Sequence, residues 1–410
     1  VEEHVVRFFL PVDDARRSYD FELRREAADR TRHGFVVVAD PQVFARGEFA
    51  LLARAADDIR ATAEEADRPF HGICVGDLIA GDHTFYPQYN ETMARTGLAF
   101  RNAMGNHDMK IWGRSYESSL RAFEDVYGPS HYSYNVGKVH YVVLNDNFFI
   151  GRDWYYIGYL EERQLAWLER DLACVAPGST VVVAIHIPTA FRGKDGQPFD
   201  YAKAAKTLAN YKALHRLLEP YRAHILSAHE HYNENYTPVP HVFEHVHAPL
   251  STLFWQTPLS MDGIPAGYAV YEADGGRIAS WYWKAVDHDR GRQFTAYAAG
   301  ADRHKPDAVT VNVWNYDPAW KVRWYEDGRC RGEMTRYTGY DESICDYVAR
   351  YGDRFKYKYI GAAQTEHLFY AVPSSPDAEV RVEVTDRFGN VYEWSAGKGY
   401  TSRPAAQTAK

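Results

Sequence analysis

Five short apolar runs in the first 235 residues each end in side chains of the types that bind metal ions. Such runs, separated by helical patterns, are typical of strands buried on both faces of an α/β sheet. Ligands of these sheets gather at the carboxyl ends of the strands. We therefore expect the polar groups at the run ends to converge on one metal site. They are Asp40, Asp77, the Gly-Asn-His-Asp sequence at 105–108, His186, and His229 with His231.

Each of these features also has an ordinary explanation when it is taken alone. Gly-Asn-His-Asp is a common polar turn, and Asp40 before Pro41 is a typical turn former. A histidine at an apolar run, such as His186, is often a hydrogen-bonded core residue. Five such endings in one order favour a shared metal site over five unrelated turns and core residues.

The same motifs resemble a known family. Asp40-Pro41-Gln42, Gly76-Asp77, Gly105-Asn106-His107-Asp108, His186 and His229-Glu230-His231 are similar, in order, to the signatures of the calcineurin-like metallophosphoesterases. The resemblance spans residues 34 to 285. Two positions depart from the family pattern: Gln42 stands where the family usually has histidine, and Ala228 where it usually has glycine. The second change concerns only the approach of the backbone.

The resemblance implies two divalent metal ions, of manganese, iron, zinc or magnesium. Asp77 would bridge them, since one carboxylate can offer an oxygen to each cation. The neutral oxygen of Gln42 favours Mn²⁺, Mg²⁺ or Fe over tightly held Zn²⁺. Four protein ligands at each ion leave positions open for water and substrate. The expected ligands are Asp40, Gln42, Asp77 and His231 at one ion, and Asp77, Asn106, His186 and His229 at the other.

The implied reaction is hydrolysis of a phosphomonoester or a phosphodiester. A metal-bound hydroxide would attack phosphorus directly, without a covalent enzyme intermediate. By analogy with the family, His107 would be the general acid that protonates the leaving oxygen. Asp108 would orient the His107 ring, as a carboxylate fixes the tautomer of a catalytic imidazole.

A polar loop at 191–206 is expected to overhang the site. Its residues Phe191 and Arg192 are candidate substrate contacts. Arg192 has the geometry to bind a phosphate with two parallel hydrogen bonds. A solvated loop arginine is the alternative.

A second class of function also fits the motifs. The chain would then be a cell-surface protein that binds glycan or another ligand on a catalytically degenerate phosphoesterase scaffold, with Gln42 as the first sign of decay. His107 argues against this alternative, because binding alone does not need a general acid. If the chain is an enzyme, these motifs do not distinguish one class of phosphoester substrate from another, because they describe only the metal site.

The composition of the chain limits the kinds of partner that it is expected to bind. The chain has 410 residues, with 47 basic and 55 acidic side chains and a net charge of −8. No broad basic face for nucleic acid is indicated. We expect a small-molecule or glycan-linked phosphoester as substrate, and the sequence identifies no protein partner.

The predicted fold is α/β: a two-sheet β-sandwich flanked by helices, in αββα layers, followed by an all-β sandwich-like domain. Helices are expected at 48–66 and 161–172, and hairpins around Gly137-Lys138 and residues 274–276. Further strands are expected to pair across Asp317-Pro318 and across residues 388–390. The predicted domains are an N-terminal segment at 1–29, a catalytic domain at 30–287, a β-sandwich at 288–400 and a disordered tail at 401–410.

The cellular location of the protein is predicted from weaker sequence signals than the metal site is. No apolar run approaches about 18 residues, so no membrane-spanning segment is predicted. The first residues lack an initiator methionine and an apolar leader core, which indicates a processed or truncated form. Bacterial relatives with a C-terminal β domain are often exported, so the periplasm or cell surface is expected. The cysteines show no zinc-binding spacing, and a bridge between Cys330 and Cys345 is left open.

Overall fold

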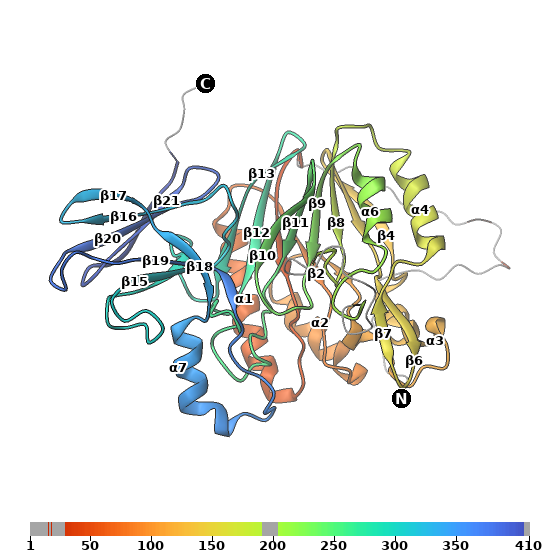
Figure 1. Ribbon diagram of the computed structural model, residues 1–410. Coiled ribbons are helices and arrows are strands. Elements are labelled where there is room, and N and C mark those ends of the chain that lie inside the picture. Colours follow the sequence, from red (N-terminus) through yellow and green to blue (C-terminus); the bar gives the residue numbers. More distant parts are fainter. Residues whose placement is uncertain (1–14, 16–17, 19–28, 191–203, 406–410) are drawn as a thin grey trace. The chain divides into compact units, whose positions relative to one another are not determined.

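The computed structural model describes residues 29–190 and 204–405, together with Ala15 and Ser18. The chain forms two compact units (Figure 1). The first contains the described residues of Val1–His229, with Thr237–Glu244 and Tyr271–Ala279. The second contains Glu230–Tyr236, His245–Val270 and the described residues of Ser280–Lys410. The linear domain limits given above stay predictions.

One sheet has the strand order β13-β12-β1-β2-β3. β1, β2 and β3 run parallel, with Val38 opposite Cys74 and Val75 opposite Ala103. β1 is buried from its second residue onward, as expected for a strand covered on both faces. The parallel order brings the carboxyl ends of β1, β2 and β3 to one edge. The bounds are β1 Arg32–Val38, β2 Phe70–Val75, β3 Phe100–Ala103, β12 Gly267–Asp274 and β13 Arg277–Ala285.

A second large sheet has the order β10-β11-β9-β8-β5-β4. β5, β8 and β9 run parallel, and β4 returns antiparallel to β5. The predicted hairpin turn contains Gly137 at φ 56°, where a Cβ would lie 2.2 Å from the carbonyl oxygen of Arg30. The bounds are β4 Tyr132–Val136, β5 Val139–Val143, β8 Thr180–Ala184, β9 Arg222–Ser227, β10 Glu234–Val239 and β11 Val242–Val246.

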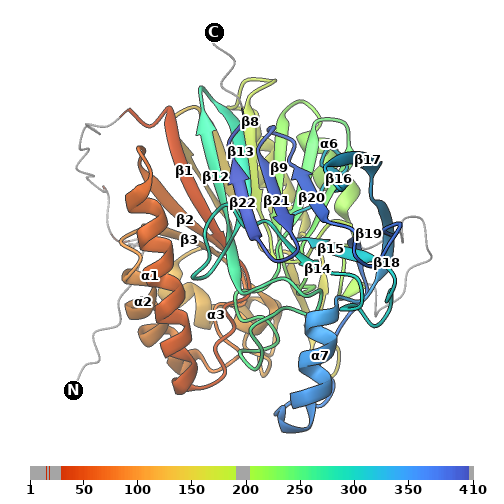
Figure 2. The same ribbon diagram turned by 90° about the vertical axis from the view of Figure 1, so that its left-hand side faces the viewer.

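Helices cover both sheets. α1 buries Phe49, Leu52 and Ile59 at helical spacing and lies beside α2 next to β1, β2 and β3 (Figure 2). α4 and α6 lie beside the sheet that contains β8 and β9 (Figure 1). Leu165 and Leu168 of α4 and Leu214 of α6 join one apolar core with β8 and β9. The predicted α/β layers are therefore confirmed. The bounds are α1 Phe49–Glu65, α2 Tyr86–Ala94, α3 Tyr116–Tyr127, α4 Glu162–Leu172 and α6 Tyr211–Leu218.

Short elements fill the loops at the strand ends. Three are 3-10 helices, and a two-stranded hairpin, β6-β7, follows β5. No helix among the described residues is long and apolar enough to cross a membrane. The bounds are η1 Arg46–Glu48, η2 His83–Phe85, η3 Asn106–Asp108, β6 Asn147–Gly151 and β7 Tyr155–Gly158.

The second unit is a β-sandwich, with sheet orders β14-β15-β19-β18 and β17-β16-β20-β21-β22. Side chains from both sheets, among them Val311, Phe369, Val382 and Trp394, form one apolar core. The bounds are β14 Phe294–Tyr297, β15 Val309–Val313, β16 Lys321–Glu326, β17 Arg329–Glu333, β18 Thr335–Gly339, β19 Thr365–Ala371, β20 Val380–Thr385, β21 Val391–Ser395 and β22 Gly399–Arg403.

Three expectations for this unit are wrong. β15 and β16 do not pair across Asp317-Pro318 but lie in different sheets, where β19 and β20 are their partners. The unit is not all-β, because it contains α7, Glu342–Tyr351, followed by η4, Gly352–Arg354. The tail is ordered as far as β22, which pairs with β21.

All four cysteine thiols are free, including Cys330 and Cys345.

Asp341 begins α7 and connects it to the sandwich. Its buried carboxylate accepts hydrogen bonds from the amides of Ser343 (2.9 Å) and Ile344 (3.2 Å) at the helix N-terminus. It also accepts from the hydroxyl of Tyr297 (2.8 Å) and the amide of Asn312 (2.9 Å). We expect Asp341→Ala to lower the free energy of unfolding by about 3 kcal/mol, because it removes an N-cap and leaves buried donors unpaired.

Urea denaturation followed by tryptophan fluorescence measures this loss. Asp307→Ala is the matched control, because Asp307 is an exposed carboxylate of the same unit and surface changes usually alter stability by less than about 0.5 kcal/mol. A loss no larger than that of the control would show that the Asp341 contacts contribute nothing.

Candidate metal centre

Six of the seven predicted ligands lie in the first unit, just beyond the ends of core strands. Asp40 and Gln42 follow β1, Asp77 follows β2, Asn106 opens η3 after β3, and His186 and His229 follow β8 and β9. Asp40, Asp77 and His186 each offer a ligand atom such that the three atoms lie within 4.8 Å of one another, and all three residues are buried. This convergence is what the strand-end pattern predicted.

His186 Nε2 is at the centre of the cluster. It lies 3.1 Å from Asn106 Oδ1, 3.1 Å from His229 Nδ1 and 3.5 Å from Asp77 Oδ1. Four donor atoms from four different strand ends therefore face one another. Each of the three distances is short enough for the two atoms to bind one cation together.

Hydrogen bonds to carbonyl groups assign the proton on each of the two imidazoles. His186 Nδ1 lies 2.8 Å from the carbonyl oxygen of Val75, and His229 Nε2 lies 2.9 Å from that of Ala205. A carbonyl oxygen only accepts, so both of these nitrogens carry hydrogen. Burial lowers the pKa of His229 to about 4, so its ring is neutral near pH 7. His229 Nδ1, which faces His186 Nε2, therefore presents a lone pair.

Gln42 and Asp77 extend the same acceptor cluster. Gln42 Nε2 donates to Asp77 Oδ2 (3.2 Å), and the amide of His107 donates to Asp77 Oδ1 (2.8 Å). The Gln42 side-chain oxygen is buried and has no hydrogen-bond partner among the described residues. Burial of an unpaired oxygen is costly, and a cation would satisfy it. Burial also raises the pKa of Asp77, an effect that a neighbouring cation would oppose.

The backbone at the site is held in a conformation that L residues rarely adopt. Asp40, Gln42, Asp77 and His229 have φ values of 42°, 39°, 53° and 68°. Such outliers cost energy and concentrate at functional sites. Gly105 is needed for a different reason: a Cβ there would lie 2.2 Å from Asp77 Oδ1.

The two predicted catalytic residues are differently placed. His107 is half-buried, and burial lowers its pKa to about 4. Asp108 is fully buried, and it accepts from the amides of Gly105 (2.9 Å) and Leu78 (3.2 Å) and from the hydroxyl of Tyr86 (3.2 Å). Among the described residues it makes no hydrogen bond to the His107 ring. Asp108 holds the loop that carries the ligands, and the structure gives no support to its predicted orienting role.

Several residues that support the ligands were not predicted. Asp146 accepts from the amides of His186 (3.1 Å) and Ile187 (2.8 Å), and burial raises its pKa to about 8. Tyr155 donates its hydroxyl to the carbonyl oxygen of Asn106, and the Tyr156 hydroxyl lies 3.3 Å from His229 Nε2. Asp146 lies two residues after Leu144, the last residue of an apolar run, which is the only sequence signal that pointed to it. The tyrosines carry no such signal.

The remaining predicted residues are not placed with these six. His231 belongs to the second unit, where its φ is 61° and its ring lies 5.2 Å from that of Phe254. Its role as a ligand stays a prediction. Phe191 and Arg192 lie outside the described residues.

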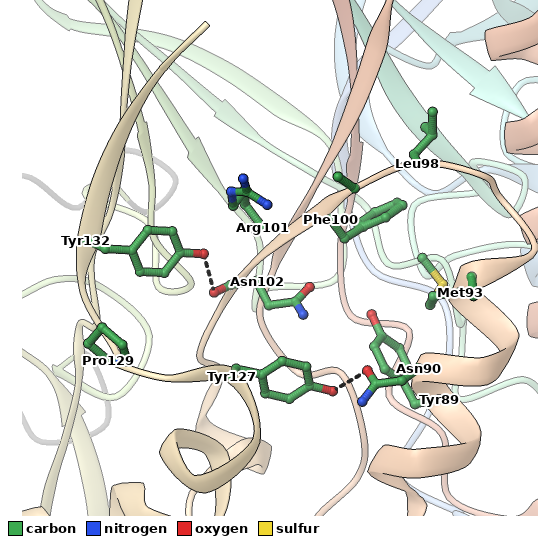
Figure 3. A pocket seen from close by; sticks show the side chains of 12 residues that line it. Tyr89, Asn90, Met93, Leu98, Phe100, Arg101, Asn102, Tyr127, Pro129 and Tyr132 are labelled. Carbon is green, nitrogen blue, oxygen red and sulfur yellow. Dashed lines mark hydrogen bonds between the residues drawn. The ribbon is translucent and has the colours of Figure 1, made fainter. Parts of the chain in front are cut away.

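A separate cavity of about 470 Å³ lies beside β3, α2 and the end of α3. Figure 3 shows its lining, where Tyr127 donates to Asn90 and Tyr132 donates to the carbonyl oxygen of Asn102. None of the predicted ligands lines this cavity. It is therefore not part of the candidate metal centre.

Two family models match the chain. The model of calcineurin-like phosphoesterases matches residues 33–233, and the model for the C-terminal part of calcineurin-like phosphoesterases matches residues 244–392. The chain therefore belongs to the calcineurin-like phosphoesterase family and carries the family's C-terminal region. The resemblance seen in the motif order is confirmed. A search of curated proteins found no match.

Solved structures of low sequence identity were also found. A dimetal phosphatase from Danio rerio is 16% identical, with a TM-score of 0.41 over 62% of this chain and 99% of that chain. A phosphopantetheinyl hydrolase from Mycobacterium tuberculosis is 11% identical, with a TM-score of 0.35 over 54% and 91%. A 5'-nucleotidase from Candida albicans is 10% identical, with a TM-score of 0.36 over 64% and 53%. The family assignment depends on the two family models and not on these structures.

Proposed function

We propose that this chain is a dinuclear-metal-dependent phosphoesterase that hydrolyses a phosphomonoester or a phosphodiester. The observation that carries the proposal is the cluster of acceptor atoms around His186 Nε2. His186 Nε2 and His229 Nδ1 lie 3.1 Å apart, and the other nitrogen of each ring donates to a carbonyl group. A divalent cation bound by these groups would stabilise the arrangement.

The residues present fit divalent ions. Carboxylate, amide and imidazole groups bind manganese, iron, zinc and magnesium with different preferences. The buried side-chain oxygen of Gln42 has no hydrogen-bond partner among the described residues and is available to bind a cation. We propose that Asp77 bridges two ions. Asp40, Gln42 and His231 would complete one ligand set, and Asn106, His186 and His229 the other.

Two divalent ions would supply an activated water and neutralise charge on the phosphoryl oxygens. The chain's own groups would hold this centre and move the proton. Tyr155 fixes the backbone of Asn106, and Asp146 fixes that of His186. His107 would deliver a proton to the leaving oxygen. Its ring is neutral in the free protein, and an anionic phosphate ester beside it would raise its pKa, since an opposite charge favours the protonated form.

We place the substrate among small-molecule phosphoesters, including glycan-linked ones, because the net charge of −8 does not favour nucleic acid. Export to the periplasm or cell surface stays a prediction. The identity of the metal is part of the test below.

The test uses metal-stripped protein with Mn²⁺, Zn²⁺, Mg²⁺ or Fe²⁺ restored, one at a time. Hydrolysis of nitrophenyl phosphate and bis-nitrophenyl phosphate is measured side by side. We expect turnover that requires metal, and the ratio of the two rates would separate monoesterase from diesterase activity. Folded protein that binds two ions and hydrolyses neither ester with any of them would contradict the proposal and favour the binding alternative.

A further inference from the structure

Large apolar side chains are exposed on the hairpin β6-β7 and in the loop that follows η3, next to the candidate metal centre. Among the described residues of the first unit, Trp112 is 61% exposed, Trp154 63%, and Ile111 and Ile150 41% each. The remaining exposed large apolar side chain of this unit is Leu51, at 43%, on α1. Single exposed apolar residues are normal, whereas a group of them marks a binding surface. Here the group is confined to two segments, 111–112 and 150–154.

Both segments are attached to the centre by hydrogen bonds. Tyr155 follows Trp154 directly, and its hydroxyl donates to the carbonyl oxygens of Asn106 and Met109, the latter at 3.5 Å. Met109 begins the loop that carries Ile111 and Trp112. Because one hydroxyl bonds to a predicted ligand residue and to this loop, the hairpin β6-β7 and the loop both border the site.

The two segments also contact each other at their exposed ends. The guanidinium carbon of Arg152 lies 3.9 Å from the centre of the Trp112 ring, which is a close cation–π contact. Tyr156, on the far side of Tyr155, has its hydroxyl 3.3 Å from His229 Nε2. The turn of the hairpin and the first residues of β7 therefore carry both the exposed side chains and the contacts to the centre. We call Ile111, Trp112, Ile150, Arg152 and Trp154 the aromatic rim.

We infer that the aromatic rim binds the leaving group of the substrate and that this group is planar and apolar. The inference rests on the proposed function, which places the phosphate at the metals. An aromatic ring offers a large apolar face at little cost in side-chain freedom, and stacked pairs gain further from their geometry. Arg152 adds a positive charge to the rim, so a cationic leaving group is disfavoured. The substrate class is thus a phosphoester whose leaving group bears an aryl ring and is uncharged or anionic.

The experiment compares benzyl phosphate with methyl phosphate, whose leaving alcohols have nearly equal acidity. A difference in kcat/KM then reports contacts with the leaving group rather than its chemistry. We expect the wild-type enzyme to prefer benzyl phosphate by about tenfold. Trp112→Ala and Trp154→Ala should each reduce this preference at least threefold. Leu51→Ala is the matched control, because it removes an exposed apolar side chain outside the rim.

Calorimetric binding of benzylphosphonate and methylphosphonate to the metal-loaded protein gives a readout that needs no turnover. If the protein hydrolyses neither ester but still binds benzylphosphonate more tightly than methylphosphonate, the proposed function would be overturned. The inference about the aromatic rim would be supported. Hydrolysis of both esters at equal kcat/KM, or a benzyl preference unaffected by both tryptophan variants, would overturn the rim. Binding to phosphatidylcholine vesicles that is lost in the variants, with no change in ester preference, would also overturn it, since the rim would then serve a membrane surface.

Discussion

Asp77→Ala is expected to abolish metal-dependent hydrolysis and to lower the bound metal from two ions to one or none. Asp77 is the only predicted ligand shared by both ions, and its two oxygens already organise Gln42 and the His107 amide at 3.2 and 2.8 Å. Loss of a partner outside the ligand set typically costs 10- to 100-fold in affinity or activity. Loss of the bridge itself should therefore cost more than about 100-fold in kcat/KM.

Metal content by mass spectrometry and hydrolysis of nitrophenyl phosphate measure the two effects. Asp125→Ala is the matched control, because Asp125 is an exposed carboxylate on α3 of the same unit. We expect it to keep two ions and full turnover. An Asp77→Ala protein that retains both ions and most of its activity would mean that the acceptor cluster is not the metal centre.

His107→Ala is expected to have an effect that depends on the leaving group. The metals should stay bound, because His107 contributes its backbone amide and not its ring to the bonds seen at the centre. General acid catalysis contributes about 10²- to 10⁴-fold, and an alkyl phosphate needs it most because its leaving oxygen is strongly basic. We therefore expect a loss in this range for methyl phosphate and a loss of less than about tenfold for nitrophenyl phosphate.

His304→Ala, at an exposed histidine of the second unit, is the matched control and should change neither rate. Metal content is measured in parallel. Equal losses on the two esters would argue against proton donation by His107, and a loss of metal would show a structural role instead.

The placement of the ligands was within reach of sequence analysis, because each ligand follows a short apolar run. That pattern is local, and parallel strands carry their ends to a common edge whatever the rest of the chain does. This pattern selected Asp40, Asp77, Asn106, His186 and His229, whose role as ligands stays a prediction. Strand pairing in the second unit was not within reach of sequence analysis, because β15 and β16 find their partners β19 and β20 more than 50 residues later, and the turn at Asp317-Pro318 does not encode them.

The sequence by itself determined the family, the donor types and their order along the chain. The tertiary structure decided which atoms face one another. Asp108 neighbours His107 in sequence, yet its carboxylate is used by Gly105, Leu78 and Tyr86, since adjacent residues of a 3-10 turn point in different directions. Carbonyl groups of distant segments hold one nitrogen of His186 and one of His229, so that the other two nitrogens face each other. The contact between Arg152 and Trp112 joins segments 40 residues apart, because long-range contacts depend on how elements pack and not on neighbouring residues.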